Sequence, residues 1–163
     1  MSRDRQVLIF GGLILAAFGM LYGVYYALFV EHQALDQMGG SLATAFVNAA
    51  ERKMSESGAA LDQYAAIKYD YVRQVDVHSH WIGLAMLMII LGLAFDRVSF
   101  TESIRFWIAL VLTAGSVIFP LGVILQTVSH GSAFASVLAI LGSGLVIMAL
   151  GATALGFARQ RVA

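Results

Sequence analysis

The sequence predicts an all-α, polytopic membrane protein: a four-transmembrane-helix bundle with a short helical extramembrane cap between helices 1 and 2. Hydrophobic residues make up 60% of the 163 residues and charged residues only 12%, against roughly a quarter charged in soluble domains. Several stretches are about 20 mostly apolar residues long, the length that crosses a bilayer. There is one proline, Pro120, so little interrupts the helices.

Four spans are expected within a single membrane domain of residues 1–163. The first has an uncharged apolar run, longer than the 7–15-residue core of a signal peptide, so we expect it to be retained. Ser99 and Glu102 have the spacing of a capping box before the third span, and Trp107 stands where an interfacial anchor belongs. The expected boundaries are about 7–30, 77–95, 104–128 and 134–158.

The segment 31–76 holds most of the polar residues and predicts the cap. It has no proline, and its glycines are Gly39, Gly40 and Gly58. We expect these glycines to separate two helices, because glycine is a common helix terminator. One helix would cover about 41–55, and the other would start near residue 59 and continue into the second span.

Basic residues predict the orientation, since cytoplasmic loops carry an excess of Lys and Arg. The short loop 129–133 carries none, whereas six arginines flank the opposite ends of the spans. Both termini are therefore expected in the cytoplasm and the segment 31–76 outside, which is the periplasm for a bacterial inner membrane. The six are Arg3, Arg5, Arg97, Arg105, Arg159 and Arg161.

Small and polar residues predict the packing faces, because membrane helices approach one another through them. The first span has a stripe of small residues that includes a GxxxG pair, and the fourth has a second stripe. The stripes are Gly12, Ala16, Gly19 and Gly23 in the first span, and Ser136, Ala139, Ser143 and Ala154 in the fourth.

Composition and missing motifs exclude several functions. There is no cysteine, which removes thiolate sites, disulfides and c-type haem attachment. The formal net charge is zero and no basic run indicates a nucleic-acid partner. No HExxH motif, phosphate-binding loop, nucleophile elbow or hydrolytic triad is present. We therefore expect a redox carrier or an accessory subunit rather than a stand-alone enzyme.

All four histidines, His32, His78, His80 and His130, fall at the outer end of the predicted bundle. Ionisable groups at membrane depth are costly and tend to be functional. Asp76 lies one helical turn before His80, as a carboxylate that orients a ligating imidazole does. His78 is about 200° round the helix from His80, so we expect it to face the cap, the lipid headgroups or water.

These histidines predict a cofactor site. Haem b needs two axial imidazoles, for which His80 and His130 are the main candidates. A copper or zinc ion would take three or four ligands and would add His32, His78 and Asp76. On helix rise, His80 lies about 24 Å from the inner end of its span, within the outer leaflet, and His130 at or above the surface. The cap would close such a site from above.

Two functional hypotheses follow. The first is a redox protein that holds haem b or copper/zinc and passes electrons between quinone and an outer-face redox protein. The second is a non-catalytic accessory or assembly subunit that binds other membrane subunits. The layout is similar to that of small four-helix membrane cytochromes b, a likeness of architecture alone. A transporter ranks lower, because the spans lack paired buried charges.

Overall fold

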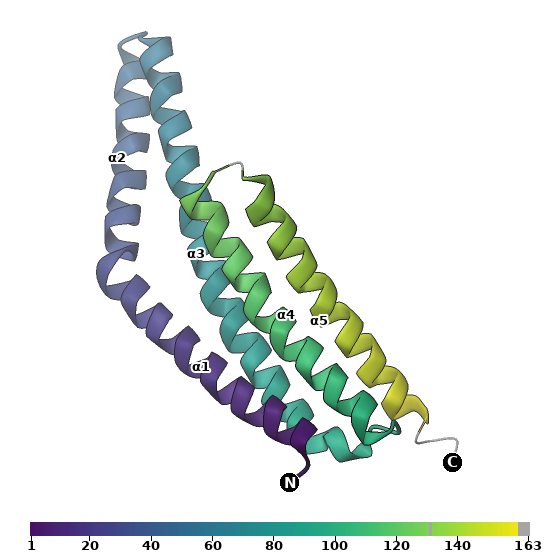
Figure 1. Cartoon of the computed structure of the whole chain (residues 1–163). Helices are drawn as coiled ribbons and strands as arrows, with labels where there is room; N and C mark the ends of the chain where they lie inside the picture. The colour runs from purple at the N-terminus through teal and green to yellow at the C-terminus, as the bar shows by residue number, and fades with distance from the viewer. Residues whose placement is uncertain (131, 160–163) are drawn as a thin grey trace. The chain divides into compact units, whose positions relative to one another are not determined.

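The computed structural model describes residues 1–130 and 132–159, so Arg161 of the predicted inner-side set lies outside the described residues. The described residues form five α-helices and no strand, which confirms the all-α prediction (Figure 1). The elements are α1 (Arg3–Phe29), α2 (Glu31–Ala50), α3 (Met54–Ala94), the short 3₁₀ helix η1 (Phe95–Arg97), α4 (Glu102–Val128) and α5 (Ala133–Arg159).

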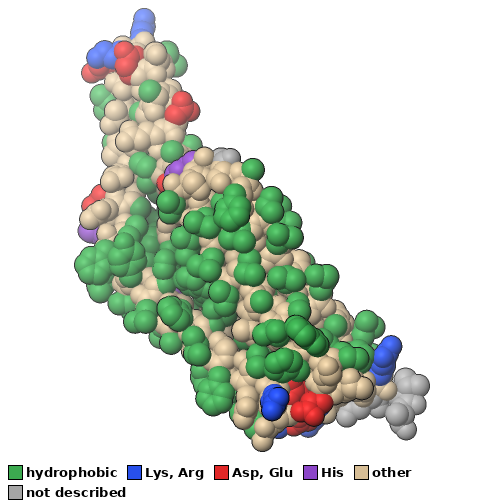
Figure 2. Space-filling model, in the orientation of Figure 1, with side chains coloured by type: hydrophobic (Ala, Val, Ile, Leu, Met, Phe, Trp, Pro, Cys, Tyr) green, Lys and Arg blue, Asp and Glu red, His purple; other side chains and the backbone are tan. Residues whose placement is uncertain are grey.

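Four helical segments in the described part of the chain are long and apolar enough to cross a membrane, as predicted. Three of them, α1, α4 and α5, have 27 residues each, or about 40 Å at 1.5 Å per residue. That exceeds the roughly 30 Å of a hydrocarbon core. The fourth is the apolar C-terminal part of α3. Hydrophobic side chains cover the middle of these helices on the face that Figure 2 shows.

The helix boundaries between the first two spans differ from the prediction. Gly39 and Gly40 lie inside α2, and Gly58 lies inside α3, which runs unbroken for 41 residues. The chain turns instead at Arg52, which has a left-handed φ of 61°. Glycine in a helix costs only about 1 kcal/mol relative to alanine, and two long helices packed along their length offset that cost. In place of the short cap that the sequence predicted, α2 and the first half of α3 form a long helical hairpin.

The chain divides into two compact units, which we call the bundle unit (Met1–Met20 with Val77–Ala163) and the hairpin unit (Leu21–Asp76). In the hairpin unit, α2 packs on the first half of α3 through small side chains. Ser57 is buried and its hydroxyl donates a hydrogen bond to the Ala45 carbonyl at 2.9 Å. Ser41, Ala45 and Ala60 are buried with it. Small residues in this seam allow the two helices to approach closely.

In the bundle unit, successive helices run in opposite directions (Figure 1). Glycines allow neighbouring helix backbones to approach closely at two contacts. A Cβ on Gly142 of α5 would lie 2.4 Å from the Phe119 nitrogen of α4, and one on Gly122 would lie 2.4 Å from the Ala139 nitrogen. On the other side, a Cβ on Gly12 of α1 would lie 2.8 Å from a carbonyl of α3. Backbone therefore meets backbone at both contacts.

The packing face of α5 is only partly the predicted one. Its buried residues recur every three or four positions, which is the period of a helix face. Of the predicted stripe only Ala139 belongs to this set, and Ala154 is exposed. Small residues occur all round α5, so composition alone did not separate the packed face from the others. The buried set is Ala135, Ala139, Gly142, Val146, Ala149, Thr153 and Gly156.

Charged side chains form a cluster at the N-terminal end of the bundle unit, which sequence analysis did not anticipate. Asp4 is completely buried, and its Oδ2 lies 3.2 Å from Nε of Arg105 on α4. The pair is at ionic distance without hydrogen-bond alignment, so the attraction is Coulombic. Arg5 forms an ion pair with Asp96 and donates to the Gly92 carbonyl at 3.1 Å. The cluster joins the starts of α1 and α4 to the end of α3.

The α4–α5 contact predicts the effect of one methyl group. Gly142→Ala forces the two backbones apart and should cost about 1–3 kcal/mol of unfolding free energy, the usual cost of overpacking. Gly144→Ala is the matched control on the same helix, because its Cβ would meet nothing within 4 Å. Unfolding of the detergent-purified variants, followed by circular dichroism, measures both. Equal stability of the two variants would contradict this packing.

The buried ion pair predicts that removing one partner lowers the unfolding free energy more than removing both. Arg105→Met leaves the Asp4 carboxylate buried without its counter-charge, and loss of one partner of a buried pair costs about 3–5 kcal/mol. The double variant Asp4→Leu with Arg105→Met should regain most of that stability, since an apolar pair leaves no charge uncompensated. Arg3→Met, at an exposed position, should change little. A double variant no more stable than Arg105→Met would show that the two residues are not coupled.

Candidate histidine site

The structure distributes the predicted ligands over both units. His78 and His80 lie half-buried on the part of α3 that belongs to the bundle unit. His130 follows the end of α4 in the same unit and is exposed. His32 is an exposed residue of α2, and Asp76 is half-buried; both belong to the hairpin unit. The bundle unit therefore supplies three of the four imidazoles.

The sequence predicted that His78 faces the cap, the lipid headgroups or water; in the structure its half-buried ring contacts α1. Its Nδ1 lies 2.9 Å from the carbonyl oxygen of Gly19. The approach is possible because Gly19 has no side chain: a Cβ there would lie 3.0 Å from Trp81 Cβ and from Ile82 Cδ1. The small-residue stripe of α1 is thus what brings a backbone carbonyl to this imidazole.

The partner of His78 decides which of its ring nitrogens carries the proton. A backbone carbonyl can only accept a hydrogen bond, so Nδ1 must be the donor. In the neutral ring, Nε2 then bears the lone pair. This is the arrangement of a ligating histidine, which commonly donates its other N–H to a carbonyl or carboxylate.

His80 points to a different helix. Its ring meets Phe119 of α4 edge-on, with centroids 4.7 Å apart and an interplanar angle of 81°. Because α3 is continuous through both histidines, neighbours two positions apart face different sides, as their 200° separation requires. From Phe119, α4 continues for about 14 Å to its end at Val128, short of His130. On helix rise, His130 therefore lies further along the direction of α4 than Phe119.

The proposed metal ligands do not form a cluster in the described part of the chain. No group of three or more His, Asp or Glu residues there is arranged so that it could hold a metal ion. A copper or zinc site would need at least three such donors. The donor set in this arrangement therefore does not fit a protein-bound copper or zinc ion, whereas haem requires only two imidazoles.

Gln126 belongs to helix packing rather than to an open site. Its Nε2 donates to the Ser136 hydroxyl of α5 at 3.3 Å. A buried glutamine in a membrane helix commonly forms such a bond between helices. The bond ties the C-terminal part of α4 to the N-terminal part of α5.

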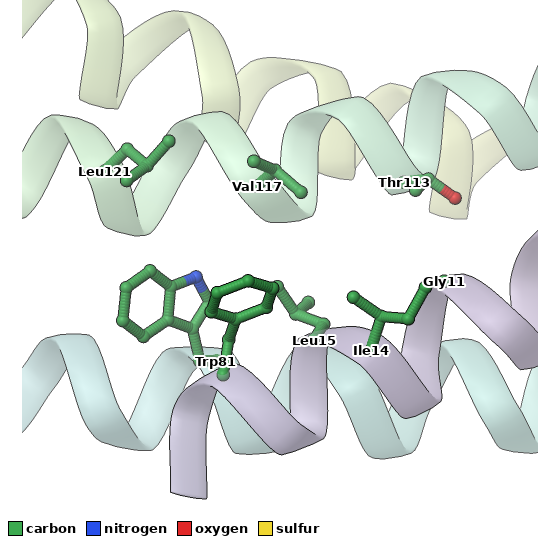
Figure 3. A pocket seen from close by; sticks show the side chains of 8 residues that line it. Gly11, Ile14, Leu15, Trp81, Thr113, Val117 and Leu121 are labelled. Carbon is green, nitrogen blue, oxygen red and sulfur yellow. The ribbon is translucent and has the colours of Figure 1, made fainter. Parts of the chain in front are cut away.

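An apolar groove runs between α1 and α4, with Trp81 of α3 between them (Figure 3). It has a volume of about 420 Å³ and exposes no polar surface. Thr113, the one residue of the lining with a hydroxyl, donates it to the Ala109 carbonyl of its own helix at 2.8 Å. Trp81 directly follows His80, so the groove reaches the level of the histidines. The lining is Gly11, Ile14, Leu15, Phe18, Trp81, Thr113, Val117 and Leu121.

Three glycines of the bundle unit do not serve its own packing. A Cβ on Gly83 of α3, or on Gly144 or Gly151 of α5, would meet nothing within 4 Å. In contrast, a Cβ on Gly12, Gly19, Gly122 or Gly142 would lie within 3.0 Å of a neighbouring helix. Sequence alone did not separate these two classes, because the distinction depends on which face of each helix meets a neighbour.

Comparisons with protein-family models, with curated proteins and with solved structures find no match for this chain.

Proposed function

We propose that this chain is a multi-pass inner-membrane redox protein that binds haem b through a histidine of α3. Both termini would lie in the cytoplasm and the hairpin between the first two spans in the periplasm. The distribution of arginines supports this orientation. The protein would exchange electrons with quinone in the bilayer and with a redox protein at the outer face.

The observation that carries this proposal is the pair of half-buried imidazoles on the apolar part of α3, His78 and His80, each in contact with a different helix. Ionisable side chains inside a membrane unit are rare without a function. Haem is favoured over copper or zinc because it needs two protein ligands rather than three or four. When bound, haem supplies a one-electron couple, and the protein holds and orients it.

The proposed haem ligands are those that the sequence indicated. His80 and His130 are the proposed main haem ligands. His32, His78 and Asp76 were expected to hold a metal ion, but they form no metal-binding group in the described residues. The apolar surroundings of α3, including Trp81, suit a porphyrin better than an ion.

A reduced-minus-oxidised visible spectrum of the detergent-purified protein tests the proposal. We expect a sharp α-band and about one haem per chain, either as purified or after addition of hemin. The double variant His78→Ala with His80→Ala should lose the band, because no imidazole remains on α3. Gly83→Ala is the control, since it adds a methyl group in open space on the same helix. A wild-type protein that neither carries nor takes up haem, copper or zinc would overturn the proposal.

A second candidate function is a non-catalytic accessory or assembly subunit of a larger membrane complex. The observation that favours it concerns two glycines of α5, Gly144 and Gly151, at which a built Cβ would meet nothing within 4 Å. The other two glycines of this helix, Gly142 and Gly156, are closely packed. Small residues let a neighbouring membrane helix approach closely. Under this hypothesis the histidines would be interfacial and the outward face of α5 would meet a partner subunit.

Native gel electrophoresis in mild detergent separates the two functions. For an accessory subunit, Gly144→Leu with Gly151→Leu should move the chain from a larger complex to the monomer, because leucine blocks close approach. Met148→Leu, a same-size change at an exposed α5 position, is the control. The variant His80→Ala with His130→Ala should leave the complex intact. A wild-type protein that is already monomeric in its own membrane extract would exclude the accessory role.

A further inference from the structure

We propose that a phospholipid whose headgroup carries both a phosphate and a primary ammonium binds in the seam between α1 and α4. The phosphate would lie against Arg3 and the ammonium against Glu102, and one acyl chain would fill the apolar groove of Figure 3. The juxtaposition that carries this inference is a charged pocket and an apolar groove along one seam. The inference does not depend on the redox function proposed above.

The headgroup pocket lies where α1 and α4 begin. Its volume is about 530 Å³, and it is lined by Arg3 of α1 and by Glu102, Ser103 and Phe106 of α4. A guanidinium binds a phosphate through charge-assisted hydrogen bonds, and a carboxylate accepts such bonds from an ammonium. One zwitterionic headgroup therefore complements both charges of the pocket.

The neighbouring charges are already paired, which leaves Arg3 and Glu102 for a ligand. The other charged side chains of α1, Asp4 and Arg5, form ion pairs with residues of α4 and η1. In the described part of the chain, the side chains of Arg3 and Glu102 belong to no ion pair, and both residues are exposed. A purely anionic headgroup would meet repulsion from Glu102, so the pocket favours a zwitterion.

The pocket and the groove lie on the same faces of the two helices. Their lining residues recur at intervals of three, four, seven or eight positions, which keeps them on one side of a helix. Both helices begin at the same level, because Asp4 of α1 pairs with Arg105 of α4. The seam is therefore continuous. The recurring residues are Arg3, Gly11, Ile14 and Phe18 on α1, and Phe106, Thr113, Val117 and Leu121 on α4.

The spacing along the seam requires a long acyl chain. On α4 the groove begins at Thr113, about 16 Å from Glu102, and ends at Leu121, about 28 Å from it, at 1.5 Å per residue. A bilayer with its headgroup regions is about 40–45 Å thick, so the groove lies around the midplane when Glu102 is at headgroup level. An extended chain therefore enters the groove with its far half, and a short chain does not reach it.

The groove suits an apolar chain better than other occupants. Figure 3 shows Val117 and Leu121 of α4 on one side of it and Ile14 of α1 on the other. The groove exposes no polar surface, so it offers the carbonyl groups of a quinone ring no hydrogen-bond partner. A second copy of the chain, packed through the groove, would leave the two charges of the pocket without partners.

Native mass spectrometry of the full-length protein in detergent tests the proposal with three dioleoyl lipids: phosphatidylethanolamine, phosphatidylcholine and phosphatidylglycerol. We expect one phosphatidylethanolamine per chain, bound about 3–10-fold more tightly than the other two, the range for a charge-assisted contact at an exposed site. Phosphatidylcholine has no ammonium N–H to donate to Glu102, and phosphatidylglycerol has no ammonium. Dihexanoyl phosphatidylethanolamine, which is too short to reach Thr113, should bind more weakly than the dioleoyl lipid.

Two variants test the pocket. Glu102→Gln should abolish the preference for phosphatidylethanolamine over phosphatidylcholine, because a neutral amide does not attract the ammonium. Glu56→Gln, which removes the corresponding first-turn charge of α3, is its control. Arg3→Gln should weaken the binding of all three dioleoyl lipids, since each has a phosphate. Arg97→Gln, at an exposed position outside the pocket, should bind them like wild type.

One variant tests the groove. Val117→Phe should weaken the binding of dioleoyl phosphatidylethanolamine and leave that of the dihexanoyl lipid unchanged, because the added ring takes up space that only the long chain uses. Val137→Phe, the same change at an exposed position of α5, is the control. Circular dichroism checks that each variant is folded. If Val117→Phe does not fold, the comparison of chain lengths in the wild type still tests the groove.

The outcomes are distinct. Equal affinity for the three dioleoyl lipids, or a preference that persists in Glu102→Gln, overturns the headgroup assignment. Equal affinity for the dioleoyl and dihexanoyl lipids, or dioleoyl binding unchanged in a folded Val117→Phe, overturns the assignment of the groove. A wild-type dimer that Val117→Phe converts to a monomer gives the groove to a second copy of the chain, and a retained quinone gives it to that molecule; either result overturns the proposal.

Discussion

Close approach of helix backbones at glycines is the constraint on which the rest of the structure depends. In a bilayer, apolar side chains gain little from leaving lipid for protein, so helices associate through tight packing and polar contacts. Gly122 and Gly142 let α4 and α5 meet backbone to backbone, and Gly12 does the same for α1 and α3. Gly19 makes room for the side chains of Trp81 and Ile82 of α3. Since α1 is held to α3 and α4 to α5, an apolar groove remains between α1 and α4.

The buried ion pair of Asp4 and Arg105 fixes the end of the bundle unit at which α1 and α4 begin. Taking Asp4 out of water is unfavourable, and the Arg105 guanidinium offsets this only while the two stay together. Such a pair penalises any arrangement in which α1 and α4 start at different levels. It therefore specifies the relative position of the helix starts more than it adds to stability, while the glycine contacts specify how closely the helices lie side by side.

The continuity of α3 has a direct consequence for the candidate site. A helix that began between His78 and His80 could have turned both rings toward one pocket. Because α3 is unbroken from Met54 to Ala94, one ring meets α1 and the other meets α4. The two histidines are therefore not equivalent, and for His78 the Gly19 carbonyl is a backbone partner that determines its tautomer.

The sequence by itself determined the fold class and the four apolar helices. These follow from local quantities: hydrophobic run length, the charge distribution and the spacing of small residues. Even the α1 stripe with Gly19 could be identified, because a glycine repeat on an otherwise large-residue helix marks a close contact. The sequence did not predict the packing face of α5, because small residues occur on every side of that helix.

Only the tertiary structure decided the remaining features. Glycines 39, 40 and 58 stay helical because packing along the hairpin outweighs a small local propensity. Asp4 is buried because α4 places Arg105 beside it, about a hundred residues away in the chain. The proton on His78 is assigned by a carbonyl from another helix, and no pattern within α3 contains that information. Contacts between distant segments thus set the chemistry of side chains whose presence the sequence already showed.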